Sequence, residues 1–199
     1  MKRVSLLAGA VVLLGSIGFA CAQSGGDVPI IKVTPVSSTI TFGVAASIPI
    51  QGKFKTWNAT LVFGSREVTS AALHIKIDAA SVDTGSGMKN NTLKGNDFFD
   101  VKDHPYITFD STKVVQTGPT TFELDGNFSI RGVTKDEKIA FDLNGKGTGH
   151  GTLKGTMAFD RKDYGMNSGI PFIKIADRVE VNVDLTADRV GGPPPIYKQ

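Results

Sequence analysis

The chain has 199 residues, of which 22 are basic and 19 acidic, and its formal net charge is +3. This near balance provides no concentrated basic face, so the composition excludes nucleic acid as a partner. Cys21 is the single cysteine, which excludes a disulfide framework and a cysteine-ligated metal site in the folded domain.

The first 22 residues predict a cleaved signal peptide. Lys2 and Arg3 precede an apolar run, and Ala20-Cys21-Ala22 supplies the small residues that signal peptidase requires before its cut. We therefore expect the remaining chain, 23–199, to work in the periplasm or outside the cell. Two alternatives stay open. One is a lipoprotein anchored at Cys21, and the other is an uncleaved membrane helix, although the run is shorter than the roughly 20 residues of a span.

Residues 23–190 predict one all-β domain, because apolar residues recur at every second position, as they do in half-buried strands. Asn144-Gly145 suits a type I′ hairpin, and Arg131-Gly132 indicates a second turn. Two stretches, 89–99 and 161–164, predict short helices or irregular structure. The alternation indicates about eight strands, around residues 40–44, 48–54, 73–77, 107–109, 122–130, 139–143, 153–159 and 179–185.

The chain ends in a segment that does not continue the strand pattern. Pro193, Pro194 and Pro195 have no N–H to donate to a sheet, so residues 191–199 are predicted to form a flexible tail. No linker and no repeat interrupts the region before them. We therefore expect a single folded unit between the signal peptide and the tail.

An antiparallel sheet of about eight strands is expected to close into a β-barrel, because closure removes exposed strand edges. Such a barrel is either filled by its own side chains or holds one small ligand. Gly52, Gly126 and Gly155 lie in phase with apolar neighbours, which leaves room inside the barrel or permits sharp curvature. A fully packed core is the alternative that this pattern leaves open.

Short motifs follow one another along the domain in a fixed order. They are Ser81-Val82-Asp83-Thr84, Leu93-Lys94, Asp97-Phe98-Phe99-Asp100, His104-Pro105-Tyr106-Ile107-Thr108-Phe109, Leu124-Asp125-Gly126 and Arg161-Lys162-Asp163-Tyr164-Gly165. The ordered set resembles the YceI-like polyisoprenoid-binding family. The resemblance implies a lipocalin-like antiparallel barrel that encloses a long isoprenoid lipid, a binding role rather than an enzymatic one, and export to the periplasm.

Three positions depart from the pattern of that family. Ser37-Ser38 stands where many members have a His-Ser pair, Ala45 and Ala46 lie where a histidine often follows the first strand, and Thr92 replaces a histidine before the Leu-Lys pair. The departures resemble a subgroup that is linked to b-type cytochromes of the membrane. This resemblance implies a quinone-like ligand and a membrane b-type cytochrome as a partner.

The inward apolar side chains are the candidate ligand-binding residues, because a prenyl chain forms no hydrogen bonds and burial contributes about 25 cal/mol per Å². We expect the lining to comprise Phe42, Phe54, Phe63, Leu73, Ile75, Phe109, Phe128, Phe141 and Phe159, and ordinary core packing is the alternative for each. Phe98 and Phe99 are expected to cover one end, and Trp57 to stand at a mouth. A pyrophosphate head group would favour Lys53, Arg131 or Arg161 near the opening.

Other chemistries receive less support from the sequence. His74, His104 and His150 lack the short spacing of a zinc site, so no metal and no cofactor is expected. The cluster Asp97, Asp100 and Asp103 gives a hydrolase-like enzyme as one alternative, although aspartates beside turns are usually caps. An outer-membrane β-barrel is a further alternative. It would need an apolar outer band, which Lys76 and Lys138 would interrupt.

Overall fold

The computed structural model describes residues 26–169 and 174–198. The predicted signal peptide, with Cys21, lies outside the described residues. The strands are β1 (Ile30–Val33), β2 (Thr39–Ala46), β3 (Ile50–Phe54), β4 (Trp57–Phe63), β5 (Ala71–Asp78), β6 (Val82–Asp83), β7 (Tyr106–Gln116), β8 (Thr121–Ile130), β9 (Val133–Asn144), β10 (His150–Asp160) and β11 (Ile175–Gly191). The helices are α1 (Gly87–Lys94) and the short 3-10 turns η1 (Pro35–Ser37), η2 (Val68–Ser70), η3 (Ala79–Ser81) and η4 (Arg161–Tyr164).

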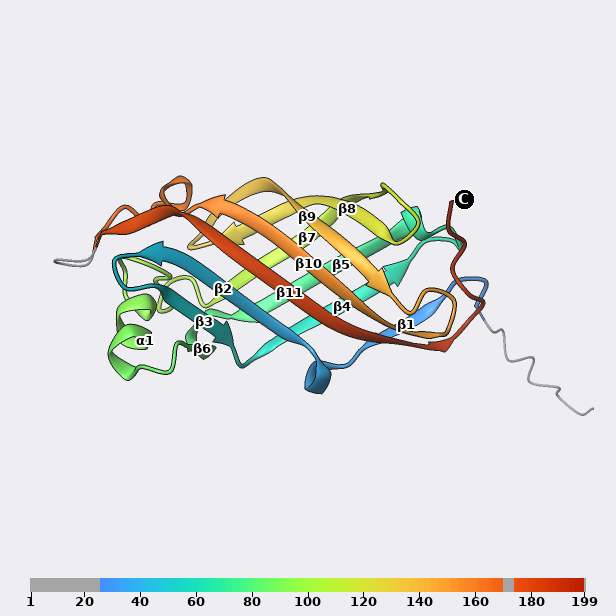
Figure 1. The fold of residues 1–199 in the computed structure, drawn as a ribbon, viewed down its shortest axis with the longest axis horizontal. Helices are drawn as coiled ribbons and strands as arrows, with labels where there is room; N and C mark the ends of the chain where they lie inside the picture. Colours follow the sequence, from blue (N-terminus) through green and yellow to red (C-terminus); the bar gives the residue numbers. More distant parts are fainter. Residues whose placement is uncertain (1–25, 170–173, 199) are drawn as a thin grey trace, which may run out of the picture.

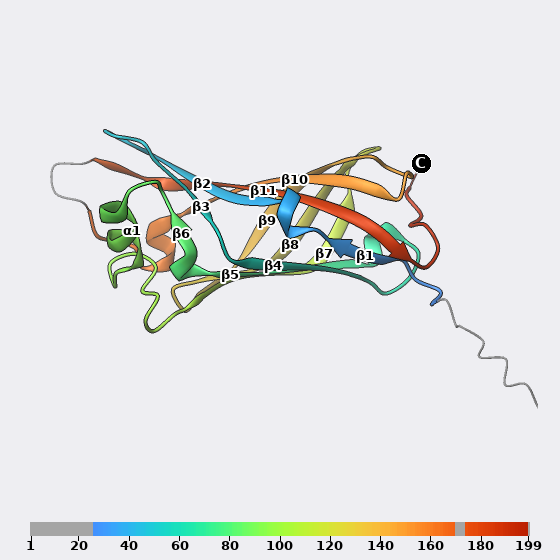
Figure 2. The ribbon, with the colours of Figure 1, turned by 90° about the horizontal axis from the view of Figure 1, so that it is seen from below.

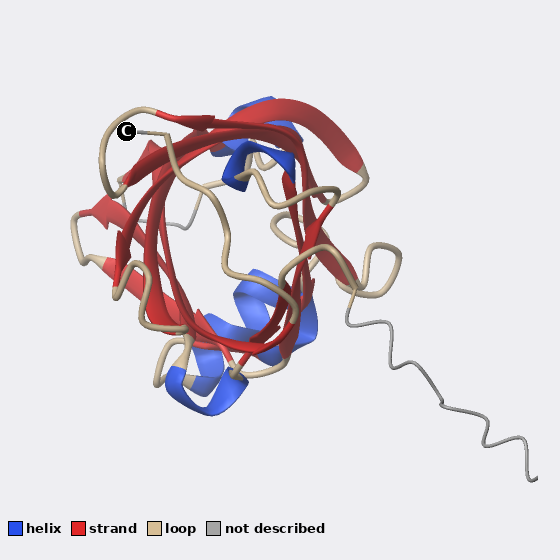
Figure 3. Ribbon diagram, turned by 90° about the vertical axis from the view of Figure 1, so that its right-hand side faces the viewer, coloured by secondary structure: helices blue, strands red, loops and turns tan. Residues whose placement is uncertain are grey.

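All of these strands belong to one sheet of 11 strands, in the order β4-β5-β7-β8-β9-β10-β11-β2-β3-β6, with β1 paired to β11 (Figure 1). The ladders are antiparallel, and viewed along its length the sheet curls round on itself (Figure 3). The prediction of a single antiparallel barrel with one or two short helices is therefore confirmed. The predicted number of strands, about eight, is too low, because the prediction did not include β1, β4 and β6.

The barrel has a seam where β3 is followed by β4. On one side of the seam the backbone N–H of Lys55 donates to the carbonyl of Ser81 at 3.2 Å, and the N–H of Thr56 donates to the Ser81 hydroxyl at 3.0 Å. Further along, β1 packs against β4. These contacts hold the two margins of the sheet together. In the described part of the chain no helix is both long and apolar enough to cross a membrane.

The turns agree with the sequence analysis in part. The turn predicted at Arg131-Gly132 is confirmed between β8 and β9, and the φ angles of these residues, 54° and 74°, give it type I′ geometry. The tight turn predicted at Asn144-Gly145 is wrong, because Asn144 still belongs to β9 and a longer loop, 145–149, leads to β10. β8 continues through Gly126 as expected, and the ladder irregularity lies opposite, in β7.

Residues 192–198 of the predicted tail, which we call the C-terminal strap, make specific contacts with the barrel. The strap crosses one open end of the barrel (Figure 3). The N–H of Ile196 donates to the carbonyl of Arg66 at 2.7 Å, and the N–H of Lys198 donates to the Gln116 amide oxygen at 2.7 Å. The prolines lack N–H groups, as argued from the sequence, but the residues that follow them supply the donors that hold the strap.

Candidate functional site

Inside the barrel, beneath the C-terminal strap, lies a cavity of about 130 Å³ that we call the strap-side hollow. Its wall is apolar, and its rim includes the glycine-rich loop between β9 and β10. The wall residues are Ile31, Leu61, Phe63, Val68, Ala71, Leu73, Val114, Phe122, Leu124, Phe141, Leu143, Leu153 and Ala187. An engineered cavity of about 150 Å³ with a similar lining accepts benzene, so this hollow has room for a small apolar group without rearrangement.

A second cavity, of about 70 Å³, lies toward the end of the barrel that carries α1. We call it the helix-side hollow. Figure 1 and Figure 2 show α1 at one end of the molecule and the C-terminus at the other. Its lining comprises Ile40, Phe42, Val44, Ile50, Phe54, Ile77, Leu93, Phe98, Phe99, Ile107, Phe128, Ile130, Phe159, Arg161, Met166, Ile175, Val179 and Val181. Arg161 is the one charged residue in this set.

Between the hollows lies a layer of buried apolar side chains that we call the waist. It consists of Ile75, Phe109, Ile139, Met157, Val183 and Leu185, which come from β5, β7, β9, β10 and β11. Ile139 and Leu185 are each only 1% exposed. The waist side chains are therefore shielded from solvent and line neither hollow.

The inward glycines lie under aromatic rings from neighbouring strands. The pairs are Phe42 over Gly52, Phe109 over Gly126 and Phe141 over Gly155. A Cβ atom on Gly52 would lie 2.6 Å from the Phe42 ring, and one on Gly126 would lie 2.6 Å from the Phe109 ring. The glycines thus provide room in an indirect way, because each allows a ring to lie flat against the wall instead of projecting into the barrel.

The structure distributes the predicted lining residues over three levels of the barrel. Phe63, Leu73 and Phe141 line the strap-side hollow. Phe42, Phe54, Phe128 and Phe159 line the helix-side hollow. Ile75 and Phe109 belong to the waist and contact neither hollow.

The predicted end-covering residues also have definite places. Phe99 packs against Phe42 and Phe54, with ring centroids 6.1 and 5.9 Å apart, and Phe98 lines the same hollow. These side chains close the helix-side hollow toward α1. Trp57 is half-buried against the core and lines neither hollow.

The cations predicted to meet a head group are directed elsewhere. Lys53 is exposed on β3, beside a shallow depression that also includes Asp83. Arg131 donates to the carbonyl oxygens of Asn96 and Gly165, at 2.8 and 3.0 Å. These contacts tie the β8–β9 turn to the segments around it.

Arg161 is buried, and its guanidinium is occupied by the protein itself. It donates to the carbonyls of Ala176 at 3.1 Å and Ser168 at 3.0 Å, to the carbonyl of Met166, and to the carboxylate of Asp177 at 3.1 Å. The ion pairs with Lys162 and Arg161 lower the pKa of the Asp177 carboxyl. Arg161 therefore holds η4 against β11, and it also lines the helix-side hollow.

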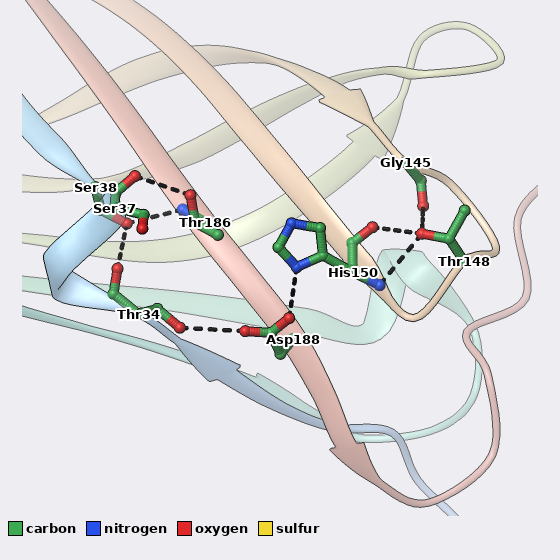
Figure 4. A network of polar contacts seen from close by, with 8 residues as sticks. All are labelled: Thr34, Ser37, Ser38, Gly145, Thr148, His150, Thr186 and Asp188. Atoms are coloured by element: carbon green, nitrogen blue, oxygen red, sulfur yellow. Dashed lines mark hydrogen bonds and ion pairs between the residues drawn. The ribbon is translucent and has the colours of Figure 1, made fainter.

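A polar group lies on the outer face of the barrel beside the strap-side hollow, where the side chains of His150 and Asp188 are 65% and 42% exposed. His150 Nδ1 lies 2.6 Å from Asp188, and the Thr34 hydroxyl donates to the same carboxylate at 3.2 Å (Figure 4). The hydrogen bond from His150 is the main reason why the pKa of Asp188 is lowered. Because Thr34 bonds the aspartate and not the imidazole, this group lacks the order of a nucleophilic triad.

The aspartates proposed for an enzyme do not converge on either hollow. Asp97 accepts a hydrogen bond from the Ser168 hydroxyl at 2.9 Å, and Asp100 faces His104 at 3.8 Å across one turn. Asp103 is exposed. In the described residues no three His, Cys, Asp or Glu side chains are grouped in a way that could hold a metal ion.

Two contributions to the site were missed at the sequence level. Val114, Leu143 and Leu153 line the strap-side hollow and follow the same alternation as the residues that were selected, so the pattern could have found them. Pro195 and Tyr197 of the strap also line it. No local pattern indicates these two, because they reach the hollow only through tertiary contacts.

Comparison with known proteins agrees with this architecture. A UPF0312 protein of Azotobacter vinelandii is 33% identical over 98 residues, which is 49% of this chain and 51% of the relative, so the alignment spans about half of each. Burkholderia cenocepacia BcnA has a similar structure, with a TM-score of 0.71 and 24% identity over 78% of this chain and 99% of BcnA. A polyisoprenoid binding domain from Saccharophagus degradans matches with a TM-score of 0.64 and 12% identity, over 81% of this chain and 99% of that domain.

These two structural likenesses establish the lipocalin-like fold that the motifs implied. The model of the YceI-like domain matches residues 32–187, from β1 through most of β11. The match includes most of the residues that line both hollows and leaves out residues 1–31, the end of β11 from 188 and the C-terminal strap. The chain therefore belongs to the YceI-like domain family.

Proposed function

We propose that this protein is a periplasmic binding protein that encloses an isoprenoid or quinone-like lipid in its barrel for transport or storage. The observation that carries the proposal is the pair of apolar hollows on the axis of a barrel whose outer face is polar. Space of this kind inside a soluble fold gains most from a ligand without hydrogen-bonding groups, because apolar burial then drives binding.

The chemical class of the ligand is supported by two further points. The structural neighbour from Saccharophagus degradans is a polyisoprenoid binding domain. Within this chain, the walls of both hollows consist mainly of aliphatic and aromatic side chains. The polar lining is confined to Arg161 at the helix side and to the strap-side rim, where Arg189 and the backbone of the glycine-rich loop lie. A prenyl chain would meet the walls, and a compact polar head group would meet the rim.

The cellular setting is part of the proposal. The signal peptide expected in residues 1–22 supports a periplasmic location. The serines, alanines and threonine that replace histidines of the family support a membrane b-type cytochrome as the partner that delivers or receives a quinone-like lipid.

The proposal is tested by purifying the protein from its own host and identifying extracted lipids by mass spectrometry. We expect a prenyl lipid in the wild type and much less of it in a variant that combines Gly52→Ala with Gly155→Ala. Both substitutions push a wall ring toward a hollow, since a Cβ at either position would overlap the ring of Phe42 or Phe141.

The matched control is Gly43→Ala on β2, where a Cβ would meet no atom within 4 Å. This variant should carry as much lipid as the wild type. A wild-type protein that yields no prenyl lipid from its host, and that also fails to bind farnesol in solution, would contradict the proposed function.

A further inference from the structure

The C-terminal strap forms part of the wall of the strap-side hollow. Pro194, Pro195 and Tyr197 line this cavity, and the strap crosses the open end of the barrel above it (Figure 3). A cavity of about 130 Å³ accepts a group of the size of benzene, whereas a prenyl chain is larger. The uptake of a prenyl chain therefore requires part of the wall to move.

The sequence of the strap combines a hinge with a stiff segment. Gly192 directly follows β11 and has a φ of 68°, a conformation that glycine adopts without strain. Pro193, Pro194 and Pro195 come next. Consecutive prolines form a stiff, extended segment, because each ring fixes its own φ. A stiff segment attached through a glycine can turn about it as one body.

The residues after the prolines are held by hydrogen bonds at the surface of the molecule. Ile196 donates its N–H to the carbonyl of Arg66 at 2.7 Å and accepts from the N–H of Val68 at 2.9 Å. The Gln116 amide accepts from the N–H of Lys198 at 2.7 Å and donates to the carbonyl of Lys198 at 3.0 Å. Both strap residues are exposed. Hydrogen bonds that solvent reaches open at a lower cost in free energy than those of a buried strand.

The cover at the other end of the barrel is built into the fold. Phe98 and Phe99 are buried, and the N–H of Phe99 donates to the carbonyl of Leu93 at 2.9 Å. Their segment lies between α1 and β7, so it is tied to the barrel on both sides. Movement is therefore expected at the strap end and not at the helix end.

We propose that the C-terminal strap is a lid on the barrel. It turns about Gly192, opens the mouth of the strap-side hollow so that a lipid enters or leaves, and closes when Ile196 and Lys198 regain their partners. The strap lies outside residues 32–187, which the family model matches, so the lid belongs to this chain and not to the barrel that the family shares. The lid rests on the proposed function for the identity of its ligand, but its movement is measurable without one.

The first test measures the opening by amide hydrogen exchange, followed by NMR on the ligand-free protein. After correction for intrinsic rates, the amides of Val68, Ile196 and Lys198 should exchange at least about tenfold faster than the amides of Phe99 and Met166 at the helix end. The latter two donate to the carbonyls of Leu93 and Arg161. Equal protection of the two groups would overturn the lid.

The second test locks the strap onto the barrel. Glu67 and Ile196 are partners in a parallel β-bridge, which brings their backbones close enough for a disulfide. The variant that combines Glu67→Cys with Ile196→Cys should hold the strap closed when it is oxidised and free it when it is reduced. Peptide mapping verifies the bond. The two single variants are the matched controls, because each carries one of the substitutions and cannot form this bond.

The double variant is loaded with farnesol in its reduced form and then oxidised. Farnesol should dissociate at least about tenfold more slowly from the oxidised form than from the reduced form, which should match the single variants. Equal dissociation rates in both forms would overturn the lid, because the lipid would then leave by another route. A wild-type protein that binds no prenyl probe, although its strap amides exchange rapidly, would instead remove the proposed function and leave the opening of the strap established.

Discussion

The two ends of the barrel are each closed by a tyrosine, but in different ways. Tyr164, in η4, is 0% exposed, packs edge-on against Phe128 and Phe159, and donates its hydroxyl to Glu137 at 2.9 Å. Tyr197, in the C-terminal strap, is half-buried and packs at a tilt against Phe122, with ring centroids 6.3 Å apart.

Burial raises the pKa of both phenols, and in Tyr164 the neighbouring Glu137 raises it further. The difference lies in how each tyrosine is joined to the rest of the molecule. Tyr164 sits between two long strands of the sheet, so it cannot leave its place without disturbing the barrel. Tyr197 follows the last strand and is held by a few hydrogen bonds and one aromatic contact, so its segment can detach at a low cost in free energy. We infer that the helix end is fixed and that the strap end opens.

The largest expected effect is at the fixed end. Tyr164→Ala removes a fully buried ring from an aromatic cluster, and such truncations cost about 3–5 kcal/mol in the free energy of unfolding. Urea denaturation followed by intrinsic fluorescence measures this change. Tyr164→Phe is the matched control. It keeps the ring and loses only the hydrogen bond to Glu137, so it should cost about 1–2 kcal/mol. Equal losses in both variants would show that the ring does not anchor this end.

Removal of the strap should change the stability only a little, but it should speed the release of a bound ligand. A chain that stops at Gly192 loses the contacts of Ile196, Tyr197 and Lys198 and should be destabilised by only about 1–2 kcal/mol. Because the strap lies across the mouth of the strap-side hollow, dissociation of bound farnesol should become about tenfold faster, which corresponds to about 1.4 kcal/mol. Stopped-flow displacement measures that rate. An unchanged dissociation rate would mean that the ligand does not leave through this end.

A milder change at the same end concerns Lys146, whose ammonium lies 4.6 Å from the centre of the Tyr197 ring and donates to the carbonyl of Pro119 at 3.0 Å. A cation–π contact at an exposed site contributes about 0.5–1 kcal/mol. Lys146→Met should therefore speed farnesol release only two- to fivefold, by about 0.5–1 kcal/mol. Lys76→Met, which removes a similar contact with Tyr106 on the outer face, is the control and should leave the release rate unchanged.

The sequence predicts some parts of this structure better than others. Strict alternation located the eight long or regular strands, because an inward position every second residue is a local property of a half-buried strand. β4 was missed although Trp57, Ala59, Leu61 and Phe63 alternate, since the small side chain of Ala59 weakens the signal. β6 is only two residues long, Val82–Asp83, and no periodicity is detectable over that length.

The candidate site was predictable in composition but not in arrangement. The inward phenylalanines are predictable as a group that faces the interior, because they follow the alternation of their strands. Their division between two hollows and a waist is not predictable in this way, because it depends on the register of neighbouring strands. The register places Phe141 opposite Gly155 and Phe42 opposite Gly52. The sequence of one strand alone does not determine such a pairing with its neighbour. The strap was missed for the same reason, since its partners are distant in sequence.

The smallest expected effect is a change in stability at acidic pH that arises at the helix end of the barrel. Asp83 in β6 pairs with Lys55 at 2.8 Å, and this hydrogen bond, together with the N–H of Gly85, lowers the pKa of the Asp83 carboxyl from 3.8 to about 2. A pKa that is lower in the folded state means that the ionised carboxylate stabilises the fold. This contribution is complete above about pH 4 and is lost as the pH falls toward 2.

Asp83→Asn should consequently lower the melting temperature at pH 7 by a small amount, and the difference from the wild type should shrink between pH 4 and pH 2. Melting curves across this range measure it. Lys55→Met removes the largest cause of the shift, so it should lower the melting temperature at pH 7 in the same direction, and the double variant should be no less stable than the less stable single one. A difference that stays constant down to pH 2 would show that Asp83 acts through its shape and not its charge, and the β3–β6 ladder would then hold the helix end without help from this ion pair.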